Sequence, residues 1–172
     1  MFTPVKGEPY IKPTITIHGS CLDVVESFTY LGSTLTCDGS LDAEIHRCIQ
    51  KASVAYGRLE KRLWSNTGIT HKTKLNVYKS CVLSVLSYSS ETWTLFRRHL
   101  KTLEHFHQKC LRRILNIKWN SNTPNTEVLS RVGCSRIETL IITAQMRWAG
   151  HAVCMSDVRM PKQLLYGQLH DG

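Results

Sequence analysis

The sequence predicts a mainly α-helical fold, with about five amphipathic helices preceded by a small antiparallel β fringe. From Leu41 onward, apolar residues recur at spacings of three and four, which is typical of helices with one buried face. Before that point, β-branched and aromatic residues alternate over short runs, as they do in strands. With 172 residues, the chain is long enough to enclose a hydrophobic core.

Residues 14–36 form the expected β fringe, after a proline-containing, extended lead-in at 1–13. Three short strands and one tight turn are predicted, and a polar break is expected to follow the third strand. Three such strands have little to pack against by themselves. The predicted strands are Thr14–Ile17, Cys21–Val25 and Phe28–Leu31, with the turn at His18-Gly19.

Residues 40–118 are expected to form a bundle of three helices. The first runs from Leu41 to about Leu63 and has acids in its first turn, where the helix dipole favours them. Thr70 is the expected N-cap of the second, which reaches Leu86. Thr94 is the expected cap of the third, with His107 half-buried in its apolar stripe.

Residues 119–172 are expected to form a helical connector and a tail. Thr123 should cap a helix that has Pro124 in its first position and ends before Gly133. A last helix is expected over Ser135–Ala152, and a loose tail beyond Met155.

Charge is unevenly distributed along the chain. Residues 1–45 carry two Lys/Arg against six Asp/Glu, a net −4, whereas residues 46–172 carry twenty against seven, a net +13. Such a positive segment suits a polyanionic partner, because Lys and Arg release the counterions condensed on phosphates. The alternative is a solvated basic surface without a partner. No apolar run has the length of a membrane-spanning helix, so no membrane is expected as a partner.

The seven cysteines include no Cys-x-x-Cys pair. Their odd number and wide spacing indicate reduced thiols and an intracellular setting, nuclear or cytoplasmic. His105 and His107 fall on different faces of one helix, so the set that they form with Cys110 predicts no metal site. His151 and Cys154 could converge, but two ligands do not close a site.

The thirteen acids are scattered and include no Asp-Asp pair. Nucleotidyl transfer needs two close carboxylates to hold two Mg²⁺ ions, so no catalytic residue and no cofactor is predicted for this chain.

The outline of a helix-turn-helix is present in Pro124–Val132, Gly133 and Ser135–Ala152. Its second helix would present Arg136 and Arg147 to DNA. Two helices that meet at a glycine are also common in helical domains generally. Aromatic and basic residues interleave in Trp93–Arg98 and at Lys118-Trp119, as in single-strand binders, although Trp is as often a core anchor.

A set of ordered motifs resembles the C-terminal part of the reverse transcriptase of non-LTR (LINE-type) retrotransposons, in particular the RTE/BovB-like group. Nearly the whole chain is covered. Cys48 and Cys154 stand where members of that family usually have Arg, and Ser87–Ser90 replaces a segment that usually reads Leu-Tyr, a small residue and Cys. The motifs are FTYLGSTLT, KASVAYGRL, TKL.VYKS.VL, ETWTL, LE.FH..CLR.IL.IKW, EVL.RVG and RWAGH.

The resemblance implies that 14–36 is the edge of a polymerase palm, that 40–118 is the thumb, and that 119–172 is the connector. The palm with its catalytic aspartates would lie upstream, so the chain by itself is expected to be no enzyme. Tyr30 and Gly32 would lie in the strand that helps hold the primer end. The basic residues expected to contact an RNA–DNA hybrid or duplex backbone are Lys51, Arg58, Lys61, Arg62, Arg97, Arg98, Lys101, Arg112, Arg113 and Lys118.

Three hypotheses therefore remain open from the sequence. The first is a truncated reverse-transcriptase fragment that binds template–primer by shape and phosphate contacts. The second is a helix-turn-helix-like DNA-binding or interaction module. The third is the product of a decayed element, marginally folded and without a function. The sequence does not determine the oligomeric state.

Overall fold

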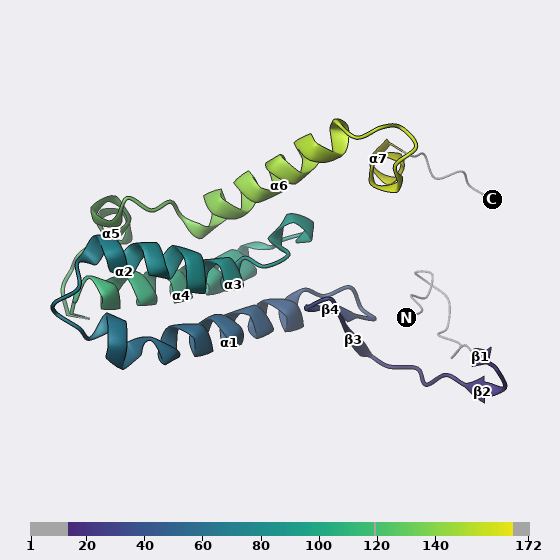
Figure 1. Cartoon of the computed structure of the whole chain (residues 1–172), viewed down its shortest axis with the longest axis horizontal. Helices are drawn as coiled ribbons and strands as arrows, with labels where there is room; N and C mark the ends of the chain where they lie inside the picture. Colours follow the sequence, from purple (N-terminus) through teal and green to yellow (C-terminus); the bar gives the residue numbers. More distant parts are fainter. Residues whose placement is uncertain (1–13, 119, 167–172) are drawn as a thin grey trace.

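A computed structural model describes residues 14–118 and 120–166 (Figure 1). It confirms the expected class: two small antiparallel hairpins precede a chain that is mainly helical. The lead-in at 1–13, Trp119 and the last six residues of the predicted tail lie outside the described residues.

The first hairpin consists of strands β1 (Thr16–Ile17) and β2 (Ser20–Cys21). His18 and Gly19 both have positive φ, 50° and 80°, so the predicted tight turn is confirmed. The second strand is shorter than the predicted Cys21–Val25. In Figure 1 this hairpin extends away from the helices.

The second hairpin consists of strands β3 (Ser27–Tyr30) and β4 (Ser33–Thr36). The polar break expected after Tyr30 was wrong, because Leu31 (φ 47°) and Gly32 (φ 89°) form a two-residue turn that reverses the chain. The polar residues of β4 then pair with β3, so the sheet is two two-stranded hairpins and not three consecutive strands.

Helix α1 (Asp42–Arg58) begins where the apolar spacing changes, as predicted. It continues into a π-helical turn, η1 (Glu60–Trp64). Trp64 ends this segment: its ring stacks on Tyr56 with the centroids 4.7 Å apart, and its Nε1–H donates to the Tyr56 carbonyl at 2.7 Å. The buried amine of Lys74 donates to the Trp64 carbonyl at 2.9 Å, which ties the next helix to this turn.

The second predicted helix is confirmed as one helical stretch with a π-helical middle. Thr70 is its N-cap, since the Thr70 side chain accepts from the Thr73 N–H at 3.3 Å. A short 3₁₀ turn, η3 (Ser90–Thr92), follows. The stretch itself consists of α2 (His71–Val77), η2 (Tyr78–Leu83) and α3 (Ser84–Leu86).

Helix α4 (Arg97–Ile114) starts later than Thr94, so the predicted cap was wrong. Phe96 is the N-cap and has no capping side chain; its own N–H donates to Nδ1 of His99, three residues on, at 3.3 Å. His107, expected to be half-buried, is fully buried because α4 is covered on that side by Tyr78 and Cys134.

Helices α5 (Asn125–Val132) and α6 (Ile137–Val153) meet at Gly133, whose φ of 58° is the left-handed conformation that glycine adopts most easily. Each begins slightly later than predicted. Pro124 is the N-cap of α5 in place of Thr123, and Arg136 is the N-cap of α6.

The tail predicted to be loose beyond Met155 contains another helix, α7 (Met160–Tyr166). Pro161 lies in its first turn, where the missing N–H has no intrahelical partner to lose. Its apolar residues Met160 and Leu164 are four positions apart, but both are exposed, and no residue of this helix is buried.

One hydrophobic core joins α1, α2–α3, α4, α5 and the start of α6. Its fully buried members on α4 are Leu103, Leu111 and Ile114. The same core extends past the expected boundary at 118, because it also includes Val128 and Ile137. The strands contribute no residue to it. The helical part is therefore a packed body from which the first hairpin projects (Figure 1).

Candidate nucleic-acid interface

Helices α1 and α4 run in the same direction along the body. Asp42 at the start of α1 contacts Arg98 at the start of α4, and Glu60 after α1 contacts Arg113 near the end of α4. Arg113 lies sixteen positions after Arg97, which at the rise of an α-helix is about 24 Å. The predicted basic residues of α4 are therefore divided between two ends of the body.

Four predicted cations follow α1 and η1, and all four are exposed. Lys51 and Arg58 lie on α1, and Lys61 and Arg62 on η1. The ion pair of Arg113 with Glu60, 3.0 Å long, places the end of α4 beside η1. We name Lys61, Arg62 and Arg113 the η1 cluster.

Three predicted arginines make contacts within the protein. Arg98 pairs with Asp42 at 2.9 Å, Arg113 pairs with Glu60, and the Arg112 guanidinium donates to the Thr123 carbonyl at 2.7 Å. Each of these three arginines therefore joins two segments of the protein. The Arg98 and Arg113 side chains remain 66% and 58% exposed, so their other N–H groups still face solvent. Arg97, Lys101 and Lys118 are exposed.

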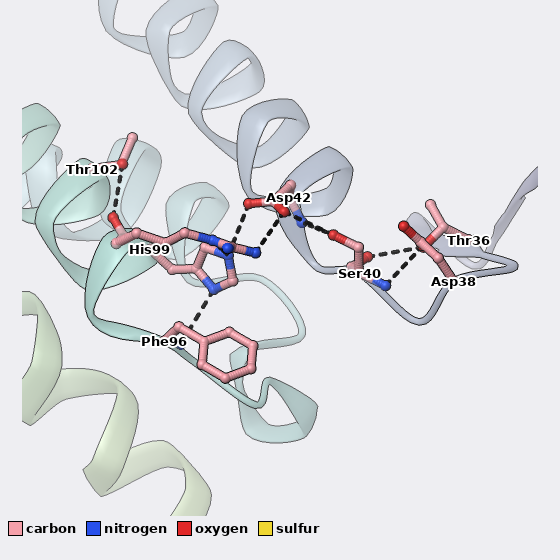
Figure 2. A network of polar contacts seen from close by, with 8 residues as sticks. Thr36, Asp38, Ser40, Asp42, Phe96, His99 and Thr102 are labelled. Carbon is pink, nitrogen blue, oxygen red and sulfur yellow. Dashed lines mark hydrogen bonds and ion pairs between the residues drawn. The ribbon is translucent and has the colours of Figure 1, made fainter. Parts of the chain in front are cut away.

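A polar network links the start of α1 to the start of α4 (Figure 2). Asp42 accepts from the Ser40 hydroxyl at 2.8 Å and from Arg98, and its other oxygen lies 2.9 Å from Nε2 of His99. Because Nδ1 of His99 accepts the Phe96 N–H, Nε2 is the nitrogen that carries a proton toward Asp42. The Ser40 hydroxyl, followed by His99, holds the pKa of Asp42 below its ordinary value.

Tyr30 and Gly32 lie on the second hairpin, which α1 and the turn after α3 hold in place. The Tyr30 side chain is 59% exposed, whereas Gly32 lies against the ring of Tyr88. The Tyr88 hydroxyl donates to the Leu31 carbonyl at 2.6 Å. Arg47 of α1 donates to Thr34 at 2.7 Å, to Thr29 at 2.9 Å and to the Gly32 carbonyl.

Glu44, which the sequence placed in the dipole-favoured first turn, has a further role. Its side chain is 2% exposed and accepts the backbone N–H of Thr34 at 2.6 Å. Sequence reasoning missed Glu44, Arg47 and Tyr88 as supports of the hairpin. Their partners lie 10 to 57 residues away along the chain, and no local pattern indicates them.

A groove of about 760 Å³ lies where α4, α5 and α6 meet. Lys101, Lys109 and Arg136 line it, together with His105 and an apolar surface that includes Leu129. Lys101 was among the predicted contacts, whereas Lys109 was not singled out. The groove gathers cations from two helices that the charge count alone could not bring together.

The histidines of α4 lie on different faces, as predicted. His105 is exposed, while His107 is buried with its Nδ1 2.8 Å from the Tyr78 hydroxyl and its Nε2 3.9 Å from the Cys134 thiol. Burial lowers the pKa of His107, so its ring is neutral at pH 7. Within the described ranges, no three His, Cys, Asp or Glu side chains are grouped so that they could hold a metal ion.

The outline of a helix-turn-helix is present in α5, Gly133 and α6. Arg136 caps α6 and lies in the groove described above, while Arg147 is exposed farther along the helix. The exposed side of α6 also carries Ile142, Met146 and Trp148, which offer few hydrogen-bond donors to base edges.

No helix among the described residues is both long and apolar enough to cross a membrane.

All seven cysteines, which lie within the described ranges, are free, and Cys48 and Cys110 are buried. Burial raises the pKa of each of these two thiols to about 12, so both are inert structural side chains.

The chain is similar to a protein of Caenorhabditis elegans that is named as an uncharacterized transposon-derived protein. The two share 27% identity over 144 residues, which cover 80% of this chain and 50% of the relative. The chain thus spans about half the length of the relative that it matches. No family model and no solved structure matches the chain. The similarity is consistent with a transposon-related origin.

Proposed function

We propose that this chain is the thumb and connector of a LINE-type reverse transcriptase and grips an RNA–DNA hybrid or duplex without catalysing polymerisation. Its ordered motif resemblance and the similarity to a transposon-derived protein support the origin. The absence of an Asp-Asp pair from the sequence supports the assignment of catalysis to another segment.

The observation that supports binding of a duplex is the placement of exposed cations along two parallel helices. The η1 cluster lies at one end, and Arg97 and Lys101 lie toward the other end of α4, with Arg97 about 24 Å from Arg113. Phosphates of one duplex recur at regular intervals along its surface, so cations at both ends of a rigid body can contact the same duplex. Such contacts recognise backbone shape and charge, not base edges.

Removal of two charges from the η1 cluster tests the grip. The variant Lys61→Gln/Arg62→Gln should bind a blunt RNA–DNA hybrid more weakly, because both side chains are exposed and free of the fold's core. The slope of log affinity against log salt should fall in magnitude by about 0.9 for each lost phosphate contact. Fluorescence anisotropy at several salt concentrations measures both quantities.

The matched control is Lys72→Gln/Lys79→Gln, which removes the same charge from exposed positions on α2 and η2. Equal losses in the two variants would mean that binding depends on net charge alone. If the wild-type chain does not bind the hybrid at low salt, the proposed grip is wrong. Product from a primer-extension assay would overturn the assignment of catalysis elsewhere.

A further inference from the structure

The groove between α4, α5 and α6 combines cations with an apolar floor. Lys101 and Lys109 line it from α4, and Arg136 lines it from the N-cap of α6. Leu129 and Ile137 supply the apolar floor. Its volume of about 760 Å³ falls within the range of sites that hold organic ligands, roughly 300–1,000 Å³.

Internal hydrogen bonds fix the walls of this groove. Glu104 accepts from the Ile137 N–H at 3.0 Å and from the Gln108 amide at 2.8 Å, so both of its oxygens are engaged. The Arg112 guanidinium holds the start of α5 by donating to the Thr123 carbonyl and to the Asn125 side chain. The lining has four Lys/Arg against two carboxylates, Glu104 and Glu138, so the groove is positive overall.

A ring at its edge makes the groove suitable for a nucleobase. His105 is exposed at its edge and offers a ring on which a base can stack. Gln108 lines the groove and is only 5% exposed, and its Oε1 has no hydrogen-bond partner among the described residues.

We propose that this groove binds a short single-stranded segment of nucleic acid. Phosphates contact Lys101, Lys109 and Arg136, while a base lies over the apolar floor beside His105. A duplex presents its phosphates on a convex surface and keeps its bases stacked inside, so it cannot fill a concave site of this kind. The inference rests on the proposed function, which makes nucleic acid the partner, and assigns the single strand a site separate from the η1 cluster.

The test uses the full chain and a labelled single strand of about 12 nucleotides, within the site sizes of known single-strand binders. Lys109→Gln/Arg136→Gln, which leaves Lys101 of the duplex grip unchanged, should lower its affinity on the order of tenfold and reduce the salt slope by about 0.7 for each lost contact. Lys72→Gln/Lys79→Gln, with the same charge change, should leave the affinity unchanged. Circular dichroism confirms that both variants keep their helices.

Probes separate the groove from the duplex grip. An abasic strand of the same length should bind the wild-type chain more weakly, and equal affinity for it would overturn the base contact. If the hybrid binds while the single strand does not, the groove site is wrong and the grip stands. Equal loss of single-strand affinity in the groove variant and in Lys72→Gln/Lys79→Gln also overturns the groove site. If the single strand binds in a way that depends on the groove residues while the hybrid does not bind, the groove site is supported and the duplex grip is wrong. Absence of binding to both probes overturns both.

Discussion

At the scale of single residues, burial decides what the titratable groups do. His107 lies in the core against Tyr78, where its ring accepts or donates only to protein groups. Its neighbour along the helix, His105, is exposed. Two identical side chains two residues apart therefore differ in function, and only the face of α4 on which each lies separates them.

The lowered pKa of His107 predicts a loss of stability in mild acid. The unfolded chain binds a proton at His107 near pH 6.5, whereas the folded chain binds it only at lower pH. The stabilising contribution is thus complete above pH 6.5 and is lost as pH falls through the folded pKa. The free energy of unfolding should fall by at most about 1.4 kcal/mol per pH unit from this group.

Urea unfolding at pH 7.0 and pH 5.5 measures this effect. His107→Gln should unfold with a smaller difference between the two pH values than the wild-type chain shows. His105→Gln serves as the control and should retain the wild-type difference. An unchanged difference in His107→Gln would contradict the assignment.

A second residue-scale prediction concerns Gly32 in the turn of the second hairpin. A Cβ at this position would lie 3.1 Å from Cε1 of Tyr88, and the φ of 89° disfavours any side chain. Gly32→Ala should therefore speed hydrogen exchange of the β3–β4 amides by loosening the hairpin. Gly39→Ala is the matched control, because φ is 66° there and nothing lies within 4 Å of the point that a Cβ would occupy. Equal acceleration in both variants would mean that backbone strain, and not the contact with Tyr88, sets the hairpin's stability.

At the scale of elements, polar contacts between helix ends fix how α1 and α4 are aligned. Asp42 joins them at one end through His99, and Glu60 joins them through Arg113 at the other. These pairs are partly exposed, so hydrophobic packing between the helices supplies most of the stability. The ion pairs specify direction and register, and they place the predicted phosphate-binding arginines at fixed points.

Removal of the Asp42 carboxylate should weaken the junction shown in Figure 2. Asp42→Ala leaves the His99 ring, which is 3% exposed, without its acceptor, so Tm at pH 7 should fall. Because the pKa of Asp42 is lowered, this contribution is present above pH 3.8 and lost as pH falls through the folded value.

The difference in Tm between Asp42→Ala and the wild-type chain should therefore shrink toward pH 3. Differential scanning calorimetry across that range checks this. Asp23→Ala, at an exposed position between the hairpins, controls for the change in net charge. A difference as large at pH 3 as at pH 7 would show that the carboxylate is not the stabilising group.

At the scale of the whole molecule, one core extends from α1 into α6. Ile137 and Ile141, which lie beyond the expected connector boundary, are each 1% exposed and belong to the same cluster as Leu103 of α4. The helices of the body should therefore unfold together in one transition. The first hairpin, which adds nothing to the core, is not expected to contribute to it.

Ile141→Ala should destabilise the entire body by about 2–5 kcal/mol, as cavity-forming substitutions in cores do. Its neighbour Ile142 is 51% exposed, so Ile142→Ala should have little effect. Far-ultraviolet circular dichroism and tryptophan fluorescence should report the same midpoint, since Trp64 and Trp93 are buried in this body. Two separate midpoints would contradict a single unit, and a transition without cooperativity would favour a decayed, marginally folded chain.

Local signals in the sequence were sufficient to predict the helical class, the order of the elements and most helix boundaries. Apolar period, Thr70 as a cap and Gly133 as a stop act within a few residues. The fold that they predicted is the one observed, apart from strand β4 and helix α7. Both were missed because β4 is polar and α7 buries no residue.

Tertiary packing instead decides which basic side chains pair with groups of the protein and which face solvent. Arg98 and Asp42 are 56 residues apart in the chain, and the groove joins Lys101 of α4 to Arg136 of α6. Composition shows that positive charge is present, but it does not show where that charge lies in space. Long-range packing brings distant segments together, and a local pattern carries no information about the partner that each side chain will meet.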